Sequence, residues 1–313
     1  MAAPIRLGAL CWNQYTTWPD LREAGKRADR LGYDTLWSWD HLYPIVGSPH
    51  GPIFEAWLVL AAWAQTTERI RIGLMVGANT FREPALTAKM ATTLDHISGG
   101  RAILGIGGAW FETGHTAYGL EFGSGFPERL RWLAEALPLM RGMLHGERPT
   151  AAGTRYSAIA VRNDPPPIQE HLPLLIGGGG ERVTLKLVAQ YGDANNVGGG
   201  IENVRRKEAV LLRHCETVGR DPDEIERTTG IGTVIIRDSR AEADRVHAAM
   251  FERNGHADRW TDQPIGTPED VAERLLPFLD LGYRHFVAGF PPPHDVESMT
   301  RFATEVRAIV ERA

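Results

Sequence analysis

Apolar and polar positions follow a repeating order along the chain, in which short apolar runs alternate with longer amphipathic segments. The short runs have the length of β-strands. We predict strands at Ile5–Cys11, Tyr33–Trp39, Ile70–Val76, Arg101–Ile106, the run that opens at Leu174, Asp193–Val197, Thr228–Ile236 and Tyr283–Gly289. The amphipathic segments predict helices at Trp18–Leu31, Ile53–Thr67, Pro84–Ile97, Phe126–Leu144, from Val183 onward, Glu202–Val218, Arg240–Arg253, Pro268–Leu281 and Val296–Glu311.

Eight strands that alternate with helices favour an α/β fold, a (β/α)8 TIM barrel with insertions, formed by one domain over residues 1–313. Gly146–Leu172 interrupts the alternation with prolines and glycines, which indicates an insertion. A doubly wound sheet is the rival fold, but there the glycines that bind nucleotides usually follow the first strand. In this chain they follow the fifth.

The segment Leu174–Val197 contains four consecutive glycines, Gly177, Gly178, Gly179 and Gly180, between a predicted strand and a predicted helix. Without side chains, the backbone N–H groups at a helix N-terminus can approach an anion. Arg182, expected in the first helical turn, adds a positive charge. These features indicate a phosphate-binding loop. The alternative is that the glycines serve tight packing, because no complete P-loop pattern is present.

Composition excludes several classes of function. The net charge of -5, with basic and acidic residues interspersed, leaves no case for nucleic acid. No apolar run reaches membrane-spanning length and the N-terminus lacks a secretory pattern, so we expect a cytoplasmic protein with no membrane partner. Cys11 and Cys215 form neither a CxxC pair nor part of a metal-ligand cluster.

In a barrel the active site is built just past the C-terminal ends of the strands. Asp40 and His41 follow the second strand, and imidazole is the side chain best suited to proton exchange near neutral pH. The alternative is that Asp40 only caps the next segment and His41 only packs. Trp39 and Trp110 lie at predicted strand ends, where a flat ligand could stack.

A metal centre is disfavoured, because the first strand ends Cys11-Trp12-Asn13 without the clustered ligands typical of metal-dependent barrels. No Gly-x-Ser-x-Gly nucleophile elbow is present either. A phosphate loop, a histidine and aromatic residues without a metal suit a phosphorylated redox cofactor, which brings its own chemistry.

Four segments together resemble the luciferase-like monooxygenase superfamily, closest to its branch of oxidoreductases that depend on the deazaflavin coenzyme F420. They are Asp40–Leu42, Ile70–Trp110, Pro173–Asn196 and the late Gly266–Val271. The resemblance covers nearly the whole chain in the same order. It implies a TIM barrel of the bacterial luciferase type, commonly a homodimer, acting on a small-molecule substrate.

Matched position by position, the resemblance places Asp40 and His41 beside the cofactor ring. It implies a cis peptide between Met75 and Val76 that shapes the seat of the ring. The other positions it assigns to the cofactor are Asn79 after the third strand, Gly107, Gly108 and Trp110 in the fourth-strand loop, and Gly177–Gly180 with Arg182 at the phosphate.

One departure from the family concerns the substrate. Members that oxidise glucose 6-phosphate carry a Glu at the position that aligns with Trp110, and the nearest acid here is Glu112, which disfavours that sugar phosphate. Glu181 places a negative charge near the phosphate loop. The sequence leaves open whether it caps the helix or points outward.

Three hypotheses for function follow. The first is hydride transfer between coenzyme F420 and an organic substrate, with His41 as proton donor or acceptor and Asp40 orienting it. The second is a monooxygenase using FMN, and the third is a barrel without cofactor or catalysis. The substrate pocket is expected to be walled by Thr113–Pro127, with His115, Tyr118 and Phe122 as candidate lining residues, and by Gly146–Leu172 and Asn254–Ile265.

Overall fold

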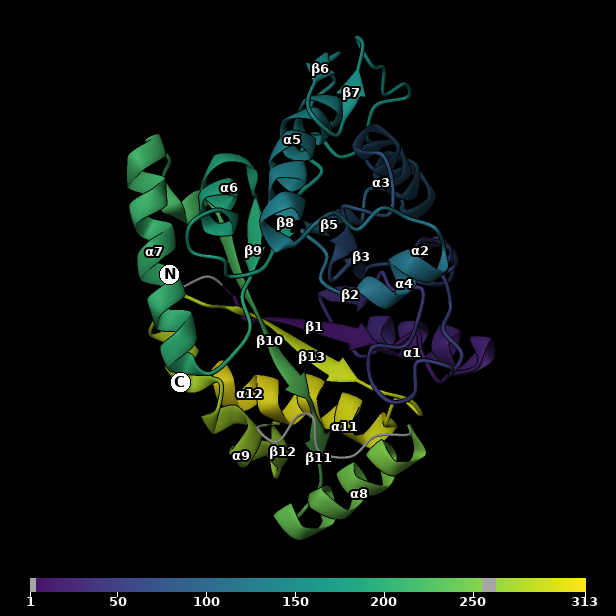
Figure 1. Cartoon of the computed structure of the whole chain (residues 1–313). Coiled ribbons are helices and arrows are strands. Elements are labelled where there is room, and N and C mark those ends of the chain that lie inside the picture. The colour runs from purple at the N-terminus through teal and green to yellow at the C-terminus, as the bar shows by residue number, and fades with distance from the viewer. Residues whose placement is uncertain (1–3, 255–262) are drawn as a thin grey trace.

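The computed structural model describes residues 4–254 and 263–313. Within them, eight parallel strands close into a barrel, each paired with the next and the last paired with the first (Figure 1). They are β1 (Arg6–Cys11), β2 (Thr35–Ser38), β3 (Arg71–Leu74), β5 (Ala102–Gly107), β8 (Leu174–Gly177), β9 (Ala194–Asn196), β10 (Glu226–Thr233) and β13 (His285–Phe290). The (β/α)8 prediction is confirmed.

Amphipathic helices cover the outside of the barrel. In α1 the buried face carries Leu21, Ala24 and Ala28, and the Thr17 side chain caps the helix by accepting from the Asp20 N–H. No helix of the described residues is both long and apolar enough to cross a bilayer. The barrel helices are α1 (Trp18–Arg30), α2 (Ala56–Thr66), α3 (Pro84–Ser98), α5 (Phe126–Leu144), α6 (Thr184–Tyr191), α7 (Ile201–Val218), α9 (Pro268–Glu273) and, after β13, α11 (Val296–Arg301). A further helix, α8 (Arg240–Arg253), packs instead on the short strands at Ile235–Ile236 and Ile265–Gly266.

The interior of the barrel is filled by a separate cluster of buried side chains, Trp37, Ile103, Leu175, Ala194 and Val287. The Trp37 ring lies so close to β3 that a Cβ at Gly73 would come within 2.7 Å of it. This packing closes the barrel below the C-terminal strand ends and leaves those ends to carry a site.

Several connections differ from their predicted form. The predicted helix Pro268–Leu281 is divided into α9 and α10 (Leu276–Leu279), because Pro277 lacks an N–H and opens a new turn. The predicted strand Thr228–Ile236 breaks at Val234, and β11 (Ile235–Ile236) leaves the barrel to pair with β12 (Ile265–Gly266). Of the expected connector Asn254–Ile265, residues 255–262 lie outside the described residues.

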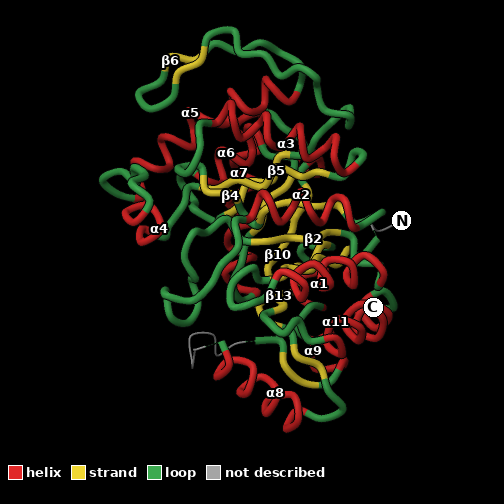
Figure 2. The backbone as a smooth tube through the Cα atoms, turned by 90° about the vertical axis from the view of Figure 1, so that its right-hand side faces the viewer, coloured by secondary structure: helices red, strands yellow, loops and turns green. Residues whose placement is uncertain are grey.

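Two loops contain structure that the sequence pattern missed. The Thr113–Pro127 segment holds part of a short helix, α4 (Glu112–Ala117), and the Gly146–Leu172 insertion contains a hairpin of β6 (Ala151–Ala152) and β7 (Ser157–Ala158). This hairpin and α8 lie at opposite ends of the molecule in both views (Figure 2).

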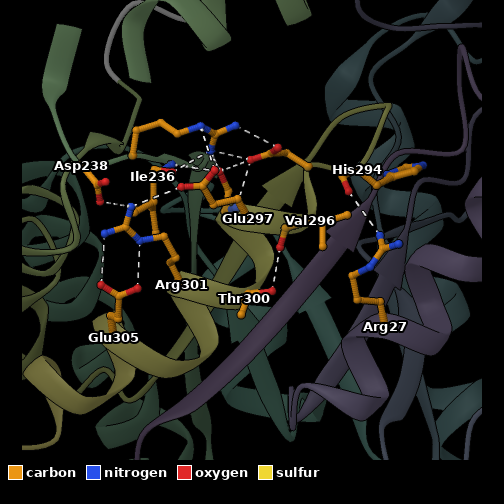
Figure 3. A network of polar contacts seen from close by, with 12 residues as sticks. Arg27, Ile236, Asp238, His294, Val296, Glu297, Thr300, Arg301 and Glu305 are labelled. Atoms are coloured by element: carbon orange, nitrogen blue, oxygen red, sulfur yellow. Dashed lines mark hydrogen bonds and ion pairs between the residues drawn. The ribbon is translucent and has the colours of Figure 1, made fainter. Parts of the chain in front are cut away.

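A polar network ties β11 to the C-terminal helix (Figure 3). The expected helix Val296–Glu311 consists of α11 (Val296–Arg301), a π-helical turn (Phe302–Val306) and α12 (Arg307–Val310). Arg237 donates to both carboxylate oxygens of Asp295, at 2.9 and 3.0 Å. Arg301 pairs with Asp238 and with Glu305, each at 2.9 Å.

Candidate active site

A cavity of about 310 Å3 opens at the C-terminal ends of β2, β3, β5 and β8. Its volume lies at the lower end of the range typical for small-molecule sites. Its wall is formed by Trp39, Asp40, His41, Ile45, Met75, Val76, Gly77, Ala78, Phe81, Gly107, Gly108, Ala109, Trp110, Phe111, His115, Phe126, Gly177, Gly178 and Asn196. Most of the predicted site residues are therefore brought together.

The floor of this cavity is largely backbone. The Met75–Val76 peptide bond is cis, as the resemblance implied. The Val76 side chain lies between the ends of β5 and β8, where a Cβ at Gly107 or Gly177 would come within 2.8 Å of its methyl groups. Glycine at these two positions lets the strand ends enclose Val76 and leaves a smooth floor.

His41 faces the cavity with its ring nitrogens free, since it makes no hydrogen bond to any described residue. Its ring meets Trp110 and Phe111 edge-on, with centroid distances of 5.6 and 5.7 Å. Burial lowers the pKa of His41 to about 4, and the neighbouring His115 adds to the effect. The imidazole is therefore neutral near pH 7 and can accept one proton.

Asp40 makes no hydrogen bond to His41 in the described structure, although the sequence led us to expect that it orients this histidine. Its carboxylate accepts from Arg82 at 2.7 and 3.1 Å and from the Ala78 N–H at 2.9 Å. Arg82 also donates to Glu55 at 2.8 Å. Burial opposes charging of Arg82, but the two carboxylates raise its pKa above the ordinary value. Asp40 thus fixes the backbone that follows the cis peptide.

His115, a candidate lining residue, does line the cavity and is held from both sides. Its Nδ1 lies 2.9 Å from the Phe111 carbonyl and its Nε2 lies 2.6 Å from the Thr80 hydroxyl. The carbonyl can only accept, so Nδ1 carries the proton. His115 thereby fixes the loop that presents Trp110. Burial lowers the pKa of His115 and the charge of Arg129 adds to this.

The other two candidates from the same loop do not reach the wall. Phe122 packs on the His115 ring at a centroid distance of 4.5 Å. Tyr118 is 61% exposed and meets Tyr43 at 6.2 Å.

The glycine loop is fixed by β9. The Asn195 amide donates to the Ile176 carbonyl at 2.7 Å and to the Gly178 carbonyl at 3.2 Å, and the Gly178 N–H donates to Asn196 at 2.9 Å. Gly178 has φ +117°, a conformation that disfavours any side chain. Gly177 and Gly178 line the cavity, while Gly179 and Gly180 continue beyond it toward α6.

The charged residues around this loop are arranged differently from the prediction. α6 begins at Thr184, so the exposed Arg182 lies in a turn ahead of the helix. Glu181 points toward α7, where its carboxylate pairs with Lys207 at 2.7 Å and Arg206 at 3.0 Å. Glu181 therefore points outward toward α7 instead of capping α6, and two cations balance its negative charge.

Asn79 lies behind the cavity wall, where it is 2% exposed. Its side chain donates to the Tyr156 hydroxyl at 3.2 Å, and that hydroxyl donates to the Asn79 carbonyl at 2.9 Å. Tyr156 belongs to the insertion, whose turn is held by backbone N–H groups that donate to Glu135. A contact of Asn79 with a cofactor stays a prediction.

Possible metal ligands and the Cys11 thiol are the other groups in the structure that could carry chemistry. Within the residues it describes, no group of three His, Cys, Asp or Glu side chains could hold a metal ion. Cys11 is fully buried and burial raises the pKa of its thiol to about 12, which keeps it protonated.

The sequence analysis missed Arg82, Phe111, Phe126, Tyr156 and Lys207. Phe111 and Phe126 could have been found from the sequence, because both are aromatic residues close to the fourth-strand loop. Arg82 lies inside the segment that carried the family resemblance, but its partner Asp40 is 42 positions away in sequence. Tyr156 and Lys207 gave no local signal, because they act across long-range packing.

Known proteins resemble this chain in sequence and in fold. The family model described as luciferase-like monooxygenase matches residues 5–264. The chain belongs to this family. An F420-dependent glucose-6-phosphate dehydrogenase of Intrasporangium calvum is 28% identical over 318 residues, covering 90% of this chain and 91% of the relative.

Two further matches are a second relative in sequence and a solved structure of the same fold. A 4-hydroxyprotoasukamycin monooxygenase of Streptomyces nodosus subsp. asukaensis is 25% identical, covering 84% of this chain and 71% of the relative. A solved F420-dependent secondary alcohol dehydrogenase, in complex with an F420-acetone adduct, superposes with a TM-score of 0.82 at 22% identity. It covers 98% of this chain and 99% of its own, and at that identity it supports the fold.

The residues present fit a flat ring with a phosphorylated tail. The cavity floor presents backbone and the Val76 wedge, which leaves room for a flat ring to approach, and aromatic side chains stand above it. Gly178 connects this floor to a glycine loop whose backbone is already fixed by Asn195. The same continuous surface would therefore serve both parts of such a molecule.

Proposed function

We propose that this protein is an oxidoreductase that transfers a hydride between coenzyme F420 and a small organic substrate. The observation that carries the proposal is the cavity itself, where His41 has free ring nitrogens above a backbone floor. The F420-dependent relative, which matches 90% of the chain, supports the choice of coenzyme.

The residues that would hold the coenzyme follow from position. Met75, Val76, Gly107, Gly108 and Gly177 would seat the ring, with Trp110 at its edge. Gly178–Gly180 and Arg182 would receive the phosphate, because glycine backbone and a guanidinium are suited to an anion. Bound coenzyme F420 supplies the carbon that accepts or donates the hydride.

The protein contributes a proton acceptor or donor at the substrate. Neutral His41 would take the proton from a substrate hydroxyl at one ring nitrogen, or return it in the reverse direction. Asp40 and Arg82 would hold the backbone beneath the ring, and the aromatic side chains would exclude water from the reacting carbon.

The test is a pair of titrations, with coenzyme F420 and with FMN, followed by quenching of tryptophan fluorescence. We expect a micromolar Kd for F420 and binding of FMN at least about tenfold weaker. Gly178→Val should weaken F420 binding, since a side chain at φ +117° distorts the loop. Gly230→Ala is the matched control, because its Cβ would meet only Asn196 Oδ1, at 3.9 Å.

Two other outcomes of the titration point to the rival functions. Preferential binding of FMN would favour a flavin monooxygenase, a class represented by the relative from Streptomyces nodosus, and oxygen uptake would then be the assay. Binding of neither would favour a barrel without a cofactor. We also infer from the family resemblance a cytoplasmic homodimer, which sedimentation and cell fractionation would test.

A further inference from the structure

The cavity wall carries almost no charge. Among the described residues that line it, Asp40 is the only one with a permanently charged side chain, and Arg82 neutralises it at 2.7 and 3.1 Å. Besides the indole N–H groups of Trp39 and Trp110, the remaining polar side chains are His41, His115 and Asn196. His115 is occupied by Thr80 and Phe111, and Asn196 donates to Thr228 at 2.8 Å. Among the described residues of the wall, His41 is left as the titratable group available to a substrate.

Large apolar surfaces border the same cavity. Trp110 is 54% exposed and Phe126 is 47% exposed, although aromatic side chains normally gain by burial. Both line the cavity, together with Phe111. Exposed aromatic groups around a concave site indicate a surface that an apolar ligand covers.

A second cation beside this wall, Arg129, also has its partners elsewhere. Arg129 lies 3.8 Å from the Phe122 ring centroid and 5.5 Å from that of Phe126, and it donates to the carbonyls of Ala109 and Phe122 at 3.3 Å. A phosphate brought against the wall would therefore lose its hydration without gaining an unpaired cation among the described residues that line the cavity. That loss is costly for any ionised group.

We infer that the substrate is an uncharged alcohol with an apolar body, or the corresponding carbonyl compound, and that its body lies against Trp110, Phe111 and Phe126. The inference rests on the proposed function. In the oxidising direction His41 would take the proton of the substrate hydroxyl, and bound oxidised coenzyme F420 would supply the acceptor for the hydride that leaves the carbinol carbon. The products are the carbonyl compound and the reduced coenzyme, and His41 then releases the proton to solvent.

The first experiment compares substrates at fixed coenzyme F420, following loss of the absorbance of the oxidised coenzyme. The panel contains 1-phenylethanol, cyclohexanol and 2-octanol, with glucose 6-phosphate as the charged comparison and glucose as the uncharged polar one. We expect kcat/KM for the best apolar alcohol to exceed that for glucose 6-phosphate by roughly a hundredfold or more. A higher value for glucose 6-phosphate, or no turnover of any apolar alcohol, overturns the inference.

The second experiment removes one aromatic wall. Phe126→Ala should raise KM for 1-phenylethanol by about tenfold while kcat and the Kd for F420 stay within about twofold, because only substrate burial is lost. Phe126→Leu should restore most of the affinity. Leu86→Ala is the control, since Leu86 is 53% exposed on α3 and does not line the cavity. An unchanged KM in Phe126→Ala contradicts the assignment of this wall.

The two proposals fail in different ways. Absence of F420 binding in the titration contradicts the proposed function. Binding of F420 with turnover of glucose 6-phosphate alone leaves the proposed function intact and contradicts the substrate class.

Discussion

Two histidines at the C-terminal end of the barrel share a lowered pKa of about 4, and burial is the main cause for both. His294, in the turn between β13 and α11, uses all of its polar atoms. Its Nδ1 lies 3.0 Å from the Phe290 carbonyl, its Nε2 lies 3.3 Å from Thr16 Oγ1, and its own carbonyl accepts from Arg27 (Figure 3). His41 has no such partners and faces a cavity. A lowered pKa therefore accompanies both situations, and the free nitrogens are what make His41 the proposed catalytic residue.

The same two regions each contain an arginine of low exposure that binds an aspartate through two hydrogen bonds. Arg82 binds Asp40 beneath the cavity, and Arg237 binds Asp295 at the start of α11. The Asp40 side chain is 2% exposed, whereas that of Asp295 is 18% exposed and has Ser298 as an additional partner. Asp40 also accepts from the Ala78 N–H, but because Asp40 is more deeply buried, we expect it to depend more strongly on its arginine than Asp295 does.

The largest expected effect comes from removing that arginine. Arg82→Met leaves the Asp40 carboxylate buried without its counterion, which should cost about 3–5 kcal/mol of unfolding free energy. Urea denaturation measures this loss. Arg237→Met is the matched variant and should cost less, because water and Ser298 can still serve Asp295. The affinity for coenzyme F420 should fall only in Arg82→Met. Equal losses of stability and affinity in the two variants would contradict the proposed difference between the two regions.

The next effect concerns catalysis alone. His41→Ala should lower kcat by about a hundredfold, equivalent to ~2.7 kcal/mol of activation free energy, because the other titratable side chains of the wall, Asp40 and His115, already have partners. Steady-state assays with F420 measure kcat, and a thermal melt within about two degrees of the parent would show intact folding. A normal kcat in the folded variant would exclude the role of His41 as acid or base.

The smallest expected effect is on the pH dependence of stability, to which both histidines contribute. Unfolded histidine titrates near pH 6.5, whereas both native histidines have pKa values of about 4. Between these limits the unfolded chain binds more protons, so stability should fall as pH drops from about 6.5 to about 4. His294→Asn, chosen because Asn tolerates the φ of +58°, should make that decline shallower and leave kcat within about twofold. A steeper decline would contradict the assignment.

The sequence could predict the fold because each strand and each barrel helix carries its own hydrophobic pattern. It placed His41, Trp110 and the glycines at the same end of the barrel, since parallel strands end together. The family resemblance supplied the cis bond between Met75 and Val76, which no local pattern encodes.

The remaining parts of the site depend on contacts between segments far apart in sequence. The partner of Asp40 is Arg82 rather than the adjacent His41, because the path of the β4 (Gly77–Ala78) to α3 connection brings the guanidinium under the cavity. Glu181 is drawn away from the phosphate loop by Lys207 on the next helix. Neither choice can be made before the helices are packed.

The bond between Tyr156 and Asn79 has a consequence for how the family could diversify. The hairpin of the insertion is tied to the rear of the cavity wall through the Tyr156 hydroxyl, while its turn is held by Glu135 from α5. The later part of the insertion is anchored separately, by hydrogen bonds of Asn163, Ile168 and Gln169 to α3. Contrary to the expectation from the sequence, no described residue of Gly146–Leu172 lines the cavity. A hairpin of another length or composition that retains the tyrosine and the glutamate should therefore leave both the barrel and the cavity wall unchanged.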